Sequence, residues 1–295
     1  MNFAIIGVGG YIAPRHLEAI KDLGHQVTVA YDCNDSVGIL DRYFPKCQFY
    51  TKYEEFQKNV LALRGTTGQI EFVSVCTPNF LHAEHIKFGL SAGANVICEK
   101  PLVLTEKDLD EIQEFEKRYD RKAYSVLQLR LHDSISALRE KIRAGDSKRH
   151  VVDLTYITSR GHWYQASWKG DVAKSGGLAT NIGVHFFDML TWIFGEASEV
   201  TSIESSSTVE RGFLRLEKAD VNWFLTIDSS YLPKEAAAAG KTTFRSIRID
   251  STEFEFSEGF TELHKKVYSD VLAGKGYGVE ANRSTTRIVE QIRKQ

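Results

Sequence analysis

A lysine stands where a buried strand should end. Lys100 follows the apolar run 94–97 and the pair Cys98-Glu99, and Pro101 comes directly after it. In open α/β sheets the chemistry occurs at the carboxyl ends of the strands. A partly buried lysine can lose its proton near neutral pH and act as a general base. The alternative is a structural lysine that forms a salt bridge with Glu99.

A second apolar run ends in the same way. Residues 73–77 are typical of a buried strand that ends at Pro78, and residues 82–92 predict a helix. If the two strands are parallel, their ends meet at one crevice. The sequence therefore predicts a site at this edge.

The segment 175–188 carries a separate set of polar side chains. Two glycines, Gly176 and Gly177, precede Asn181, His185 and Asp188, which are spaced by four and then three residues. Such spacing brings side chains to one face of a helix, provided that the helix begins early. The alternative for His185 is a histidine with a structural role in the core.

A glycine turn follows the first predicted strand. Glycine in such a turn lets the backbone approach a pyrophosphate, and the following helix supplies free amide groups. The pattern is an imperfect G-x-G-x-x-G, because Ile12 occupies the third glycine position. The residues expected to contact a dinucleotide here are Gly7, Gly9, Gly10, Tyr11 and Ile12. An ordinary strand-to-helix turn is the alternative.

Asp32 ends the second predicted strand, about 20 residues beyond the glycine turn. An acidic side chain there can bind the ribose hydroxyls of NAD and would repel the 2′-phosphate of NADP. No arginine follows before Arg42, so the sequence favours NAD. Asp32 could instead only cap a turn with Asn34 and Asp35.

A loop dense in aromatic and cationic residues lies between the two polar segments. Arginine and lysine there could bind a carboxylate or a phosphate, and the rings could stack on a ligand. Either tryptophan could instead pack in the core. The candidate substrate-binding residues are Arg160, Trp163, Tyr164, Trp168 and Lys169, with Arg130 at the predicted domain junction. Gln128, at the same junction, is a candidate cofactor-binding residue.

The pattern of elements predicts two domains. Residues 1–125 alternate strand and helix, which predicts a doubly wound parallel sheet of the Rossmann type. Residues 126–295 begin with a helix, continue as strands without intervening helices, and end in two helices at about 260–273 and 280–293. This second part predicts an α/β domain with a large, open, mostly antiparallel sheet.

Composition narrows the class of protein. The chain has 37 Lys and Arg against 39 Asp and Glu and contains no basic block, so its charge does not indicate binding to nucleic acid. Its four cysteines form no C-x-x-C pair, so we expect free thiols in the cytoplasm and no metal site. The first apolar stretch is too short to span a membrane.

The segment 77–102, TPNFLHAEHIKFGLSAGANVICEKPL, resembles the central motif of the glucose-fructose oxidoreductase / inositol dehydrogenase family of sugar dehydrogenases. The resemblance implies NAD as cofactor, Lys100 as base and His185 as a hydrogen-bond partner of the substrate hydroxyl. Asn181 replaces the usual aspartate and would orient the substrate. The residues implied at the nicotinamide are Thr77, Pro78, Asn79, His82, Glu99 and Lys100, although His82 could instead cap its helix.

Together with GGYIAPRH and TNIGVHFFDML, these segments resemble the bacterial UDP-2-acetamido-2-deoxy-glucuronate 3-dehydrogenases over the whole chain. The resemblance implies oxidation of the 3-hydroxyl of a UDP-sugar acid in surface-polysaccharide (O-antigen) biosynthesis. It also implies a homo-oligomer, dimer or tetramer, and in some members recycling of NADH by 2-oxoglutarate. The alternatives are a dehydrogenase for another nucleotide-sugar, free sugar or inositol, or a non-enzymatic NAD-binding regulator.

Overall fold

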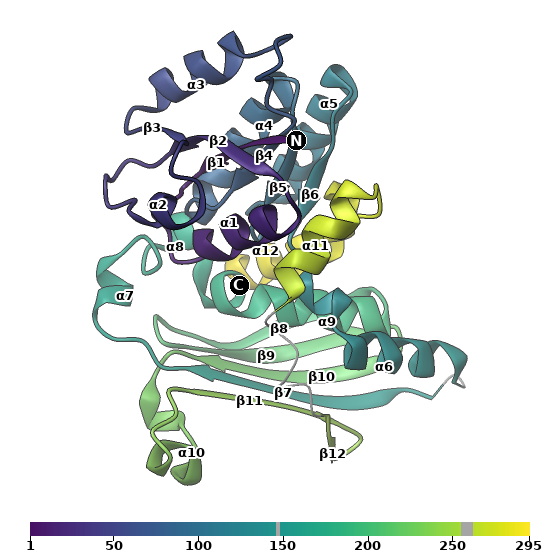
Figure 1. Ribbon diagram of the computed structural model, residues 1–295. Coiled ribbons are helices and arrows are strands. Elements are labelled where there is room, and N and C mark those ends of the chain that lie inside the picture. Colours follow the sequence, from purple (N-terminus) through teal and green to yellow (C-terminus); the bar gives the residue numbers. More distant parts are fainter. Residues whose placement is uncertain (146–147, 255–261) are drawn as a thin grey trace. The chain divides into compact units, whose positions relative to one another are not determined.

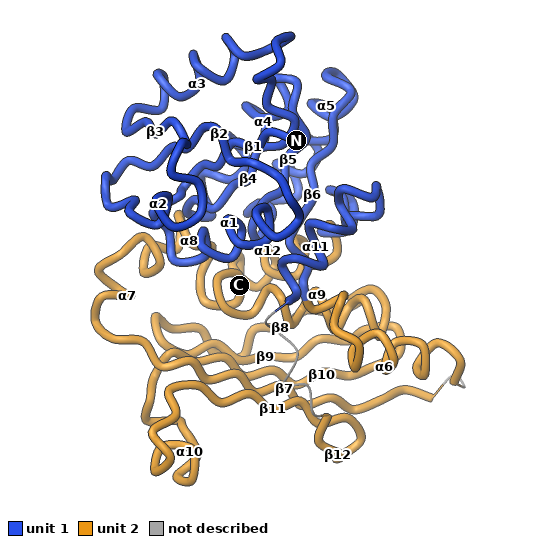
Figure 2. Tube along the Cα trace, viewed as in Figure 1, with its two compact units in different colours: residues 1–128, 261–282 blue, residues 129–260, 283–295 orange. Residues whose placement is uncertain are grey.

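The chain divides into two compact units, shown in Figure 2. The computed structural model describes residues 1–145, 148–254 and 262–295. Unit 1 comprises residues 1–128 and 261–282, and unit 2 comprises residues 129–260 and 283–295. Each unit has its own hydrophobic core.

Unit 1 is built on a parallel sheet with the order β3-β2-β1-β4-β5-β6 (Figure 1). The strands are β1 (Asn2–Ile6), β2 (Gln26–Tyr31), β3 (Gln48–Tyr50), β4 (Phe72–Val75), β5 (Asn95–Cys98) and β6 (Ala123–Ser125). Every residue of β4 is buried, as expected for a strand covered on both faces. The strand order reverses between β1 and β4, which is where ligands bind in doubly wound sheets. The predicted Rossmann fold is confirmed.

The helices of unit 1 follow local sequence signals. Pro14 lies in the first turn of α1, where its missing amide hydrogen costs nothing. The Thr105 hydroxyl caps α5 by accepting a hydrogen bond from the amide of Asp108 at 3.1 Å. The helices are α1 (Ala13–Asp22), α2 (Ile39–Tyr43), α3 (Tyr53–Ala62), α4 (His82–Ser91), α5 (Glu106–Tyr119) and α11 (Leu263–Leu272).

Unit 2 contains a sheet with the order β12-β11-β7-β10-β9-β8. The strands are β7 (His150–Thr158), β8 (Ala197–Ser205), β9 (Val209–Leu216), β10 (Ala219–Thr226), β11 (Thr243–Ile249) and β12 (Thr252–Glu253). β7 and β10 pair in parallel and the other neighbours are antiparallel. The predicted mostly antiparallel sheet is therefore confirmed.

Helix α9 lies at the centre of the core of unit 2. It is apolar on nearly every side, and it packs against α6 and α12. An all-round apolar helix must be buried, so α9 is covered by its neighbours. The helices of this unit are α6 (Asp133–Ala144), α7 (Trp163–Ala166), α8 (Val172–Ser175), α9 (Val184–Phe194), α10 (Lys234–Ala238) and α12 (Arg283–Lys294).

The division of the chain differs from the expected one at residues 126–128 and 262–282. The segment with α11 belongs to unit 1, because α11 packs on α1 and Tyr124 forms a β-bridge with Gly278. The amide of Ser125 also donates to the Tyr277 carbonyl oxygen at 2.9 Å. The two C-terminal helices are thus divided between the units, a division that their sequences do not reveal.

Parts of two expected elements, a strand at 253–256 and a helix from 260, fall outside the described residues. Within the part of the chain that the structure describes, none of the helices combines the length and hydropathy needed to cross a bilayer.

Candidate active site

The carboxyl ends of β1, β4 and β5 bring three predicted segments together in unit 1. Val75 pairs with Cys98 in the parallel register, so Thr77 and Lys100 follow neighbouring strand ends. Gly7 adopts φ +88°, and a Cβ atom there would lie 2.8 Å from the carbonyl carbon of Cys76. Only glycine fits this close approach. The expected convergence of the strand ends within unit 1 is therefore found.

Asp32 joins the glycine turn to the end of β2. Its Oδ2 accepts a hydrogen bond from the amide of Gly9 at 2.9 Å, and its Oδ1 accepts one from the amide of Asn34 at the same distance. The carboxylate therefore also caps the turn, as the structural alternative anticipated. Because it is fixed at the end of β2, it remains in the position expected for a ribose-binding acid.

The glycine turn fits the pyrophosphate of a dinucleotide. Helix α1 begins without a side-chain cap and without an acidic residue in its first turn, so no acidic side chain of that turn competes for its N-terminal amides and dipole. A Cβ atom on Gly9 would lie 3.1 Å from the Asp32 carboxylate. Tyr11 is 94% exposed, and the Gln128 carboxamide oxygen is buried without a hydrogen-bond partner among the described residues.

His82 contacts the backbone after both β4 and β5, and it does not cap α4. Its Nδ1 lies 2.7 Å from the Pro101 carbonyl oxygen, and its Nε2 lies 2.8 Å from the Thr77 carbonyl oxygen. Burial lowers the pKa of His82, while the two backbone carbonyls oppose that shift. The side chain therefore fixes the backbone on the C-terminal side of Lys100. Asn79, also predicted at this edge, is buried nearby in the turn before α4.

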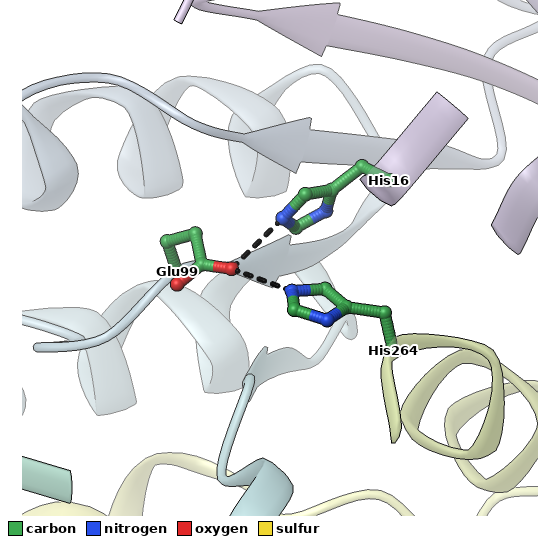
Figure 3. A group of neighbouring side chains, drawn as sticks. All are labelled: His16, Glu99 and His264. Atoms are coloured by element: carbon green, nitrogen blue, oxygen red, sulfur yellow. Dashed lines mark hydrogen bonds and ion pairs between the residues drawn. The ribbon is translucent and has the colours of Figure 1, made fainter. Parts of the chain in front are cut away.

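Glu99 points into unit 1 and meets two histidines (Figure 3). Its Oε1 lies 3.0 Å from His16 Nε2 and 3.1 Å from His264 Nε2. Its Oε2 accepts a hydrogen bond from the backbone amide of Lys100 at 3.2 Å. Two histidines and the Lys100 backbone amide therefore orient this carboxylate.

The charge state of this group follows from its hydrogen bonds. Burial raises the pKa of Glu99, but the hydrogen bonds from His16 and His264 outweigh it and hold the pKa well below its ordinary value. Burial lowers the pKa of His16. A neutral His16 can donate from Nε2 to Glu99 and accept at Nδ1 from the Tyr268 hydroxyl, 2.7 Å away. Glu99 is thus an ionised carboxylate that accepts hydrogen bonds from two histidine rings.

In unit 2, Asn181 and His185 lie in consecutive helical segments. Asn181 belongs to a π-helical turn (Ala179–Gly183) and donates from Nδ2 to the Tyr164 hydroxyl at 2.6 Å. His185 is in the first turn of α9, is half-buried, and stacks edge-on against Tyr156 with ring centroids 5.8 Å apart. The π-helical turn changes the expected simple helical spacing between these side chains.

Arg130 does not fit its expected role as a substrate cation. Its Nε donates to Asp188 Oδ2 at 3.0 Å and its Nη2 donates to Oδ1 at 2.7 Å, with both residues buried. Burial raises the pKa of Asp188, although Arg130 and the Thr285 hydroxyl oppose the rise. This two-pronged ion pair crosses from the turn before α6 to α9, so it stabilises unit 2.

The aromatic loop is divided between buried and accessible side chains. Tyr164 is buried, whereas Trp163 is 54% exposed and does not belong to the core. The ammonium of Lys169 lies 4.2 Å from the centre of the Trp168 ring, a cation–π arrangement. Arg160 is exposed. A cavity of about 230 Å³ in unit 2 has both Tyr164 and Lys169 in its wall.

Sequence reasoning missed the partners of the predicted residues. The sequence does not indicate that His16 and His264 surround Glu99. The spacing of residues 181–188 singles out Asp188, but not its pairing with Arg130. The sequence contains both histidines, but His264 is 165 positions from Glu99. No local pattern links residues at that separation.

Two family models match the chain. The model for the oxidoreductase family with an NAD-binding Rossmann fold, named for GFO, IDH and MocA, matches residues 1–127. The model for the C-terminal α/β domain of the same family matches residues 145–220. The chain belongs to the GFO/IDH/MocA oxidoreductase family. The expected enzyme class and NAD as cofactor are thereby confirmed.

Solved structures of family members extend the likeness. A WlbA (WbpB) dehydrogenase from Thermus thermophilus, in complex with NAD and alpha-ketoglutarate, is 45% identical with a TM-score of 0.96. The same dehydrogenase in complex with NAD and UDP-GlcNAcA gives a TM-score of 0.95 at 45% identity. In both comparisons 99% of this chain and 94% of the other are covered.

Curated relatives match over shorter stretches. The rhizopine catabolism protein MocA of Rhizobium meliloti is 25% identical over 149 residues, which is 50% of this chain and 45% of the relative. The chain spans about half the length of the curated relatives it matches, from 45% to 56% for three of them.

The position of Asp32 predicts the choice of cofactor. We expect NAD to bind much more tightly than NADP, because the carboxylate would repel a 2′-phosphate. In Asp32→Ala we expect NAD binding to weaken about 10- to 100-fold, the range for loss of a hydrogen bond to a charged group. Calorimetry with both cofactors measures the gap. Equal affinities of the unmodified protein for the two cofactors would contradict the role of Asp32.

Proposed function

We propose that this protein oxidises the 3-hydroxyl of UDP-2-acetamido-2-deoxy-D-glucuronate (UDP-GlcNAcA) to the 3-keto sugar with NAD as acceptor. The observation that carries the proposal is the 45% identity, over 99% of this chain, to a dehydrogenase solved with NAD and UDP-GlcNAcA. The Lys100 strand end and the His185 segment, on which the sequence resemblance rests, lie inside the matched length.

Each residue of the proposed site has its own role in the reaction. Lys100 accepts the proton of the sugar 3-hydroxyl, for which an amine at a strand end is suited once its proton has been lost. His185 hydrogen-bonds the hydroxyl and can relay its proton, and Asn181 orients the sugar through its amide. The glycine turn and Asp32 hold the two ends of the dinucleotide. When bound, NAD supplies the chemistry of a two-electron acceptor for the carbinol hydrogen.

The cations of the aromatic loop suit an acidic sugar. Arg160 is exposed, and Lys169, whose ammonium lies over the Trp168 ring, lines the cavity in unit 2. A hydrogen bond between charged groups contributes about 1.5–3 kcal/mol. We assign binding of the sugar carboxylate or the diphosphate to these two side chains. Arg130 is left out of this set because it pairs with Asp188.

We expect UDP-GlcNAcA to reduce NAD at least about 10-fold faster than UDP-N-acetylglucosamine, which lacks the carboxylate. Rates are followed by absorbance of the reduced cofactor. Arg160→Met and Lys169→Met identify which cation binds the carboxylate, because that variant loses rate on the acid but not on the neutral nucleotide-sugar. Equal activity on both nucleotide-sugars, or on free sugars, would refute this substrate assignment.

Three further points belong to the same proposal. We infer that the enzyme serves O-antigen or related surface-polysaccharide synthesis, and that NADH can be reoxidised in place by 2-oxoglutarate. The related dehydrogenase solved with alpha-ketoglutarate supports the second point. We also propose a homo-oligomer, dimer or tetramer, in the cytoplasm, a location that suits the four free thiols.

A further inference from the structure

The backbone of Lys100 is held from both sides. The Glu99 carboxylate accepts the Lys100 amide at 3.2 Å, and His82 contacts the carbonyl oxygen of Pro101 at 2.7 Å. Glu99 and His82 are both buried. A side chain can place its functional atom reproducibly only if its backbone is fixed, and misplacement by about 1 Å can cost about 100-fold in rate.

The hydrogen bonds of Glu99 belong to a continuous network of buried side chains. The carboxylate contacts His16 of α1 and His264 of α11, and His16 contacts the Tyr268 hydroxyl at 2.7 Å. The Tyr268 hydroxyl in turn lies 2.7 Å from the Ser74 hydroxyl on β4. This hydrogen-bond network therefore links α1, β4, the end of β5 and α11 inside unit 1. Helix α11 reaches this position from a distant part of the sequence.

We propose that Glu99 is a positioning residue for Lys100, and that His16 and His264 fix its carboxylate so that it holds the Lys100 amide. This inference rests on the proposed role of Lys100 as base. The role of His264 follows from geometry, because its Nε2 anchors the same oxygen that His16 binds. Helix α11 is thus part of the support for the catalytic strand end.

The same three side chains also resemble a metal site. One ligand atom from each of His16, Glu99 and His264 lies within 4.8 Å of the others. However, a neutral His16 that accepts from Tyr268 at Nδ1 carries its proton on Nε2, where it donates to Glu99. A ligating nitrogen must have lost that proton. The hydrogen-bonded arrangement accounts for both contacts of His16, so we assign a proton-bearing cluster here.

The test compares Glu99→Gln with a matched control. Glu116 also holds a strand amide in unit 1, because its Oε1 accepts from the amide of Ala123 at 2.8 Å at the start of β6. We expect Glu99→Gln to lower kcat about 10- to 100-fold while the KM values for NAD and sugar change less than about threefold. Glu116→Gln should lower the melting temperature but leave kcat unchanged. Equal effects of the two variants on kcat would overturn the proposal.

Substitutions of His264 add a test of the cluster itself. His264→Gln keeps a donor near the position of Nε2 and should retain most of the kcat, whereas His264→Leu should resemble Glu99→Gln. An equimolar divalent metal in the purified protein, whose chelation lowers kcat, would overturn the assignment. So would equal kcat values for the Gln and Leu variants.

Hydrogen exchange gives a readout that does not depend on the substrate. In Glu99→Gln we expect the Lys100 amide to exchange at least about tenfold faster than in the unmodified protein, and in Glu116→Gln we expect no change. If UDP-GlcNAcA is not oxidised but this exchange pattern holds, the proposed substrate fails and the hydrogen-bond anchor stands. Unchanged exchange in Glu99→Gln would reject the anchor whatever the substrate.

Discussion

Lys100→Met is expected to bind NAD and the sugar nearly normally and to lose about 10²- to 10⁴-fold in turnover, the size of a general acid–base contribution. Methionine matches the lysine side chain as far as Cε, with sulfur in place of Cδ, and lacks the amine. The Lys100 amide can still donate to Glu99, since that contact involves the backbone. Single-turnover rates of cofactor reduction measure the chemical step directly.

The matched control for this prediction is Lys87→Met. Lys87 is a half-buried lysine of α4 in the same unit, and its ammonium pairs with Glu111 at 2.9 Å. We expect its removal to leave the single-turnover rate unchanged, because this ion pair joins α4 to α5. A Lys100→Met rate within a few-fold of the unmodified enzyme would exclude Lys100 as the base.

Arg130→Met is expected to destabilise the protein by about 3–5 kcal/mol, since it leaves the Asp188 carboxylate buried without its cation. That is a large part of the total stability of a typical protein, about 5–15 kcal/mol. Urea unfolding followed by circular dichroism measures the loss. In the Arg130→Met background, Asp188→Asn should recover part of the stability, because the uncompensated charge is then gone.

Arg215→Met is the control for the ion pair. Arg215 pairs with Glu199 at 3.0 Å and with Asp220 at 3.4 Å, but its side chain is half exposed. Pairs on the surface contribute little, so we expect a change within about 1 kcal/mol. If both arginine variants have equally small effects, the Arg130–Asp188 pair does not stabilise unit 2 as we infer.

The sequence by itself determined the elements and the edge that carries the chemistry. Apolar runs of strand length, turns rich in glycine and helical periodicity are local signals, so the alternation of strands and helices expected over residues 1–125 is found. Parallel strands bring their carboxyl ends to one edge, which placed the glycine turn, Thr77 and Lys100 together. The motif around Lys100 was also sufficient to indicate the family.

Tertiary structure alone decided which side chains support those residues. His16 and Glu99 are 83 positions apart, Glu99 and His264 are 165 apart, and Arg130 and Asp188 are 58 apart. An amphipathic pattern states that a helix has a buried face, but not which core covers it, so α11 and α12 could not be assigned to different units. Hydrogen-bond partners follow from that packing. The sequence therefore identified the candidate base, and the fold supplied the buried anion that holds its backbone.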